Sequence, residues 1–207
     1  MKKWKVLLLA LLLGIQTLAI AGLNEGVTAY ETKDYATALK EFSTLANQGN
    51  AQAQFNLGVM YDNGQGVPKD EAQAVAWYRK AAEQGYVSAQ YNLGVMYGNG
   101  RGVPKDEAQA VAWYRKAAEQ GEAMAQTNLG LMYVNGRGVQ KDVVLAYMLY
   151  NIAAASGKEK AINNRASLEG TLSRQQITEA QAFSSAWKPG TPFPTTSRTG
   201  KLANSYR

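Results

Sequence analysis

The sequence predicts an all-α solenoid, a stack of helical hairpins. Residues 51–86 and 87–122 are nearly the same sequence and differ at six of 36 positions. A third, looser copy occupies residues 123–157, and apolar residues recur at helical spacing within each copy. A fixed period of this size is typical of stacked units, because one unit cannot bury its apolar face without a neighbour.

Each copy is expected to form two helices joined by a loop. In the first copy, Asn63 and Gly64 end the first helix with residues that tolerate positive φ. The second helix is expected to begin after Asp70, whose carboxylate caps free N–H groups while Gln73 reaches back as a capping box. Gly85 is expected to end this helix. The other copies repeat this punctuation.

Small residues lie among the large ones in these helices. Gly58 and Ala74 are the small residues, and Leu57 and Tyr78 are examples of the large ones. Small residues allow two helices to approach closely, so we expect the pair to interlock.

The third copy departs from the pattern in its second helix, DVVLAYMLYNIAAASG, where Val143, Leu145 and Ile152 replace polar residues. A helix that is apolar all round must be covered. The predicted cover is a closing helix pair, residues 158–172 and 173–187. The alternative is dimerisation through this end.

The motifs NLGVMYDNGQGV and AWYRKAAEQG resemble the Sel1-like repeat, a relative of the tetratricopeptide repeat. The resemblance covers residues 51–157 and implies a right-handed α-solenoid. Residues 22–50 resemble the shorter helix pair that opens such arrays, and residues 158–187 resemble a closing pair. The family consists mostly of adaptors, so the resemblance implies a protein or peptide partner.

The two ends of the chain differ from the repeats. Residues 1–21 combine a basic start, a short apolar stretch and an A-x-A site, which predicts a secretory signal peptide cleaved after Ala21 and a periplasmic or secreted protein without a stable membrane span. An uncleaved anchor is the alternative. Residues 188–207 are polar and rich in proline, which predicts a flexible tail, with a docking peptide as the alternative.

The charge distribution argues against nucleic acid as a partner. The formal net charge is +6, but three of the 22 basic residues lie in the signal peptide and four follow Trp187. The 15 basic residues between these segments face 16 acidic ones, so the body of the protein has no basic excess for tracking phosphates.

The sequence also argues against catalysis and predicts no cofactor or metal. Histidine and cysteine are both absent, which excludes nucleophilic triads that need them and imidazole metal sites. Ser185 and Lys188 fit the S-x-x-K motif of penicillin-recognising enzymes, but no SDN or KTG partner motif occurs. We therefore expect Ser185 to be a polar residue on the last helix.

The differences between copies concentrate on one face of the first helix. Positions 52, 55, 59 and 62 form one narrow stripe on a helix, and their chemistry changes at most equivalent positions. The second helices of the first two copies are identical. By resemblance to tetratricopeptide-like stacks, this stripe lines a concave groove that contacts ligands. Drift on a solvated surface is the alternative.

Beside the stripe, one asparagine recurs in each copy. By resemblance to related peptide-binding repeats, this amide holds a ligand's main chain, because it both donates and accepts hydrogen bonds. The alternative is that the amides bridge adjacent helices. The predicted groove residues are Gln52, Phe55, Asn56, Val59, Asp62, Ser88, Tyr91, Asn92, Val95, Met124, Thr127, Asn128 and Leu131.

These observations favour an exported, non-catalytic scaffold that binds an extended peptide or protein segment in the cell envelope. Two alternatives from other classes stay open. An organiser of envelope glycans would stack sugar rings on aromatic residues such as Phe55 and Tyr91. A hydrolase related to penicillin-binding proteins would carry a reactive serine.

Overall fold

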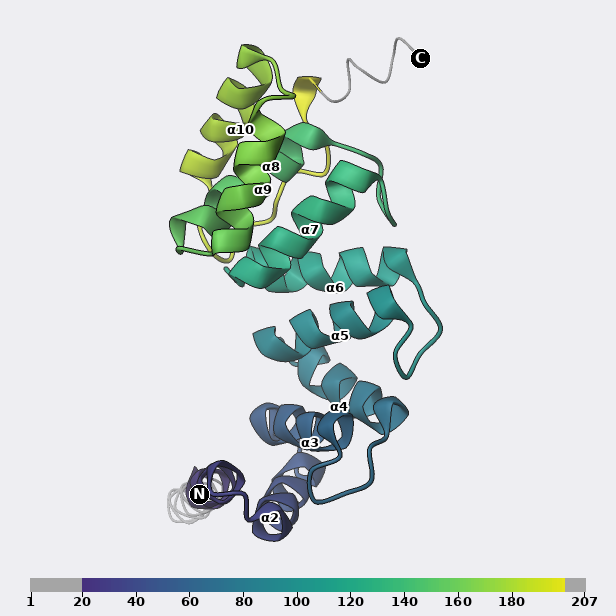
Figure 1. Cartoon of the computed structure of the whole chain (residues 1–207). Helices are drawn as coiled ribbons and strands as arrows, with labels where there is room; N and C mark the ends of the chain where they lie inside the picture. The colour runs from purple at the N-terminus through teal and green to yellow at the C-terminus, as the bar shows by residue number, and fades with distance from the viewer. Residues whose placement is uncertain (1–19, 200–207) are drawn as a thin grey trace, which may run out of the picture. The chain divides into compact units, whose positions relative to one another are not determined.

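The computed structural model of the protein describes residues 20–199, and every regular element among them is helical. Most of the predicted signal peptide and the end of the predicted tail lie outside the described residues. The helices, labelled from α2 in Figure 1, are residues 20–31, α2 (Tyr35–Asn47), α3 (Ala51–Asn63), α4 (Glu71–Glu83), α5 (Val87–Asn99), α6 (Glu107–Glu119), α7 (Ala123–Asn135), α8 (Val143–Ala155), α9 (Glu159–Glu169) and α10 (Arg174–Ala186).

The predicted hairpins are present, and the chain divides into two compact units at Tyr86 and Val87. In the first unit, α3 packs against α2 and α4 around a core that includes Phe42, Leu57 and Met60. In the second unit, α5 pairs with α6 and α7 pairs with α8. None of the helices in residues 20–199 has both the length and the apolar character that crossing a bilayer requires.

The predicted helix ends are confirmed, with one correction. The Asp70 carboxylate accepts hydrogen bonds from the backbone N–H groups of Ala72 and Gln73, and Gly64 ends α3 at a φ of 71°. The capping box predicted at Asp70 and Gln73 is incomplete, because Gln73 is exposed and only the aspartate half forms. Among the described helices, a complete capping box forms at Ser173 in α10.

Each repeat hairpin is held by a tyrosine ring that lies on a glycine. A Cβ added to Gly58 would lie 2.7 Å from the ring of Tyr78, and one added to Gly94 would lie 2.6 Å from the ring of Tyr114. Real Cβ atoms do not approach ring carbons this closely, so only glycine admits the ring. The predicted close approach of the two helices is therefore confirmed, and Gly130 and Tyr150 repeat it.

The apolar helix of the third repeat is covered as predicted. Every residue of α8 from Val144 to Tyr150 is buried. The closing helices α9 and α10 both pack against α8; Figure 1 shows them on this helix. The cover thus comes from the same chain.

The prediction of a flexible tail from residue 188 is wrong for residues 188–199, which we call the strap. Phe193 is only 5% exposed and stacks on Trp187 with ring centroids 5.0 Å apart. The Ser197 N–H and hydroxyl both donate to the buried Asp142 carboxylate, at 2.7 and 2.9 Å. Composition alone suggested disorder, because it counts only the strap's own few apolar residues and not the partners that the folded body supplies.

A pair of substitutions four residues apart in α5 tests the glycine contact. We expect Gly94→Ala to lower the free energy of unfolding by about 1 to 3 kcal/mol, because the new methyl group overpacks against Tyr114. Gly98→Ala is the matched control. Its Cβ would meet Ala110 at 3.6 Å, an ordinary contact, so it should raise stability by about 0.5 to 1 kcal/mol through helix propensity. Thermal and denaturant melts measure both stabilities. Equal unfolding free energies for the two variants would contradict this packing.

Hydrogen exchange tests the strap. In the parent protein, the amide hydrogens of Phe193 and Ser197 should exchange slowly, because each N–H donates a hydrogen bond to a carboxylate. Phe193→Ala removes a buried ring and should make both amides exchange at least tenfold faster, while α8 stays protected. Fast exchange of both amides in the parent would show that the strap is detached in solution.

Candidate binding groove

In the first unit, the predicted stripe lies on α3 but its aromatic residue is already packed. Phe55 lies between Tyr78 and Tyr86, with ring centroids 5.7 and 5.1 Å apart. Gln52 is exposed, whereas Asn56, Val59 and Asp62 are half-buried. Because both neighbours contact the Phe55 ring, it offers little free face for stacking on a sugar.

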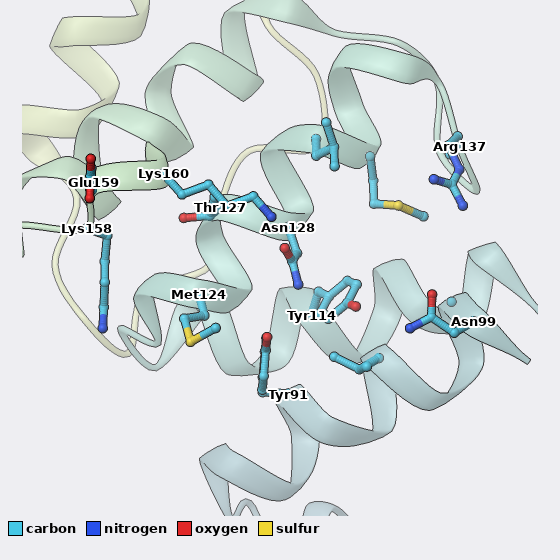
Figure 2. A pocket seen from close by; sticks show the side chains of 14 residues that line it. Tyr91, Asn99, Tyr114, Met124, Thr127, Asn128, Arg137, Lys158, Glu159 and Lys160 are labelled. Carbon is cyan, nitrogen blue, oxygen red and sulfur yellow. The ribbon is translucent and has the colours of Figure 1, made fainter. Parts of the chain in front are cut away.

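In the second unit, the stripes of two successive repeats line one cavity of about 420 Å³. Six predicted residues line it together, from α5 and α7: Tyr91, Val95, Met124, Thr127, Asn128 and Leu131. Figure 2 shows Tyr91, Met124, Thr127 and Asn128 around this space. Ser88 and Asn92, which were also predicted, do not line it. We call this cavity the groove.

The α7 wall of the groove presents exposed apolar side chains. Met124 and Leu131 are 48% and 36% exposed, which is unusual for large apolar residues of this protein. They lie seven residues apart, about two helical turns, with Thr127 and Asn128 between them on the same face. An exposed apolar strip inside a concave site is the kind of surface that a ligand's side chains can bury.

The polar part of the groove is built around Asn128. Its amide lies within hydrogen-bonding reach of the hydroxyls of Tyr91 and Tyr114, and Figure 2 shows it pointing toward both rings. Burial raises the pKa of Tyr114 to about 12, and burial also raises the pKa of Tyr91, while the Asn128 amide opposes both shifts. Both hydroxyls are therefore neutral at physiological pH and can donate or accept hydrogen bonds.

The Thr127 hydroxyl is not available to a ligand, although Thr127 belongs to the predicted stripe. Its side chain is buried, and its hydroxyl donates to the Ala123 carbonyl one turn earlier at 2.8 Å. The donor is thus already used inside α7. Thr127 shapes the groove through its size.

A second set of repeated amides is structural. Gln126 is 2% exposed, and its side chain donates to the Ala118 carbonyl near the end of α6. Gln54 makes the equivalent bond to Ala46 in the first unit. These glutamines tie a helix to the preceding one, whereas the half-buried Asn128 faces the groove.

The rim of the groove contains residues that the sequence prediction missed. Tyr114 comes from α6, Arg137 from the loop after α7, and Lys158 and Lys160 from the start of α9. Arg137 is held by Glu107, with Nη2 and Oε1 2.6 Å apart, and this hydrogen bond lowers the pKa of Glu107. The loop position was detectable, because the three copies carry glutamine, arginine and arginine there. Both lysines lie beyond residue 157, where the predicted third repeat ends, and gave no periodic signal.

Two features weighed in the sequence analysis, a metal site and a reactive serine, can be located relative to the groove within residues 20–199. No group of three or more acidic, histidine or cysteine residues within residues 20–199 is placed to hold a metal ion. Ser185 is exposed near the end of α10 and does not line the groove. The groove offers apolar contact from α7, neutral hydrogen-bonding groups around Asn128, and charged side chains at its rim.

The comparisons with known proteins agree with this architecture. The model of the Sel1 repeat matches three consecutive segments, residues 51–86, 87–122 and 123–158, which together span just over half of the chain. These limits coincide with the predicted repeats, apart from one residue at the end of the third. No curated protein matches the chain.

Two solved structures are similar over most of the chain. A Sel1 repeat protein from Oxalobacter formigenes is 42% identical with a TM-score of 0.65, over 68% of this chain and 58% of that protein. The c5321 protein of uropathogenic Escherichia coli, described as a protective antigen with an SLR fold, is 32% identical with a TM-score of 0.57, over 80% of this chain and 44% of that protein. The chain thus spans about half the length of these relatives. With its three matched repeats and stacked hairpins, the chain belongs to the Sel1 repeat family.

Proposed function

We propose that this Sel1 repeat scaffold is an exported, non-catalytic adaptor whose groove binds an extended peptide or protein segment. The observation that carries the proposal is the wall of Met124 and Leu131 beside the Asn128 amide. The exposed apolar side chains suit the side chains of a ligand, and the amide suits its main chain. The partner's identity is a matter for experiment, and an envelope protein is the proposed class.

Introducing a negative charge into the apolar wall tests the groove, with a matched control. Peptides selected from a random display library against the parent protein should lose at least tenfold in affinity for Met124→Glu and Leu131→Glu. A carboxylate in this wall would be desolvated by the ligand without a partner. Ile162→Glu is the control, because Ile162 is 39% exposed on α9 and does not line the groove. Selected peptides that bind all three variants equally would place their site elsewhere.

The role of the asparagine that recurs in each repeat, Asn56, Asn92 and Asn128, is a separate prediction. Asn128→Ala should weaken the binding free energy of the same peptides by about 0.5 to 1.5 kcal/mol, since one hydrogen bond to the peptide main chain is lost. Circular dichroism and the melting temperature should stay close to those of the parent. Unfolding of the variant would mean that the amide serves to join Tyr91 and Tyr114 across the helices. Asn56 and Asn92 can be tested in the same way.

Export is proposed on the N-terminal sequence. Mass spectrometry of the protein from a bacterial host should find a mature N-terminus at Gly22, because the A-x-A site ends at Ala21. The control is Ala21→Arg, which blocks the small-residue site and should leave an unprocessed chain. Membrane-bound parent protein that begins at Met1 would refute the cleavage.

A further inference from the structure

The rim of the groove carries more positive than negative charge. Three basic residues line the groove, Arg137, Lys158 and Lys160, against one acidic residue, Glu159. Residues 22–187 as a whole contain 15 basic and 16 acidic residues, so this basic excess is local. A concave site with a basic excess favours partners of the opposite charge.

The two lysines differ from Arg137 in having no acidic partner within residues 20–199. Arg137 is engaged by Glu107, whose carboxylate accepts hydrogen bonds from Nε at 2.8 Å and from Nη2 at 2.6 Å. In the described part of the chain, the ammonium groups of Lys158 and Lys160 form neither an ion pair nor a hydrogen bond. Both side chains are exposed. They can therefore pair with a ligand's carboxylate without first giving up a contact within the protein.

The lysines lie near the apolar wall of α7. Ala161 at the start of α9 and Ala123 at the start of α7 belong to one small apolar cluster. The lysines therefore lie near the end of the wall that Met124 forms. Figure 2 shows the Lys160 side chain extending from α9 toward Asn128. One site thus offers an apolar contact, an amide for a main chain and positive charge.

Two carboxylates lie near this end of the groove. Glu122 accepts the Met124 N–H at 3.1 Å at the start of α7, and it does not line the groove. Glu159 lines the groove and offsets part of the charge of the lysines. The lysines are therefore only partly neutralised, and the electrostatic contribution to binding should be modest and sensitive to salt.

We propose that the segment bound in the groove carries an acidic side chain next to the apolar one that packs on Met124, and that Lys158 and Lys160 pair with its carboxylate. This inference rests on the proposed function and adds the charge of the partner to it. The occupant is an acidic, extended protein segment. Because lysine is a point charge on a flexible stem, the pair selects for negative charge without demanding one fixed position of the carboxylate.

The probes are the peptides selected from a random display library against the parent protein. We expect aspartate and glutamate to be about twofold more frequent in them than in the unselected library, because the rim favours negative charge. Lys158→Gln/Lys160→Gln should weaken their binding by about threefold to tenfold at low ionic strength, since exposed ion pairs are lost. Added salt should lower the parent's affinity toward that of the variant.

Two controls separate local pairing from net charge and from loss of fold. Lys141→Gln/Lys188→Gln removes the same charge from residues that do not line the groove, and it should bind the peptides like the parent. Lys158 makes no capping hydrogen bond to α9 through its side chain, so the lysine variant should keep the parent's melting temperature. Peptides whose acidic residues are replaced by the corresponding amides should bind the parent more weakly and the lysine variant with no further loss.

The acidic partner and the groove itself fail in different ways. Peptides that lose affinity for Met124→Glu, but have no acidic excess or bind the lysine variant like the parent, would leave the groove in place and overturn the acidic partner. An equal loss in the lysine variant and its control would also overturn it. Peptides that bind Met124→Glu like the parent lie outside the groove and would overturn both proposals.

Discussion

The structure of this protein depends on one contact, the tyrosine ring laid on a glycine in each repeat hairpin. With no cysteine in the chain, no disulfide joins the two helices of a hairpin. Gly94 admits the ring of Tyr114 at a distance that no Cβ would allow, and Gly130 admits that of Tyr150. The contact sets how closely and at which rotation each pair meets. Every hairpin therefore presents the same face of its first helix.

The groove follows from that repetition in the second unit. Because α5 and α7 are oriented alike within their hairpins, equivalent positions such as Tyr91 and Thr127 line one cavity. Tyr114 has two roles, since its ring packs on Gly94 in the hairpin while its neutral hydroxyl lies within hydrogen-bonding reach of Asn128. Stability and binding are thus coupled at one side chain, and a change at Tyr114 alters both.

The hairpins, their caps and much of the groove wall were predictable from sequence, because each depends on short-range rules that a period repeats. The limits of prediction lie where contacts are long-range. Phe55 belongs to the predicted stripe, but Tyr78 and Tyr86 occupy its faces. Lys158 joins the groove only because α9 folds back on α8. The strap was not predicted, because its backbone N–H groups bond to Glu119 and Asp142, which lie far away in the sequence. The composition of a segment does not indicate such distant acceptors.

The central claim is that ring and glycine act as a unit, and a double-mutant cycle between Gly94 and Tyr114 measures this directly. Unfolding free energies are needed for Gly94→Ala, Tyr114→Leu and the double variant. If the contact between the ring and the glycine is the constraint, Gly94→Ala should lower the unfolding free energy of the parent but not that of Tyr114→Leu. The coupling energy should then be about 1 to 3 kcal/mol. Additive effects within about 0.5 kcal/mol would show that the two residues act independently and would contradict the account.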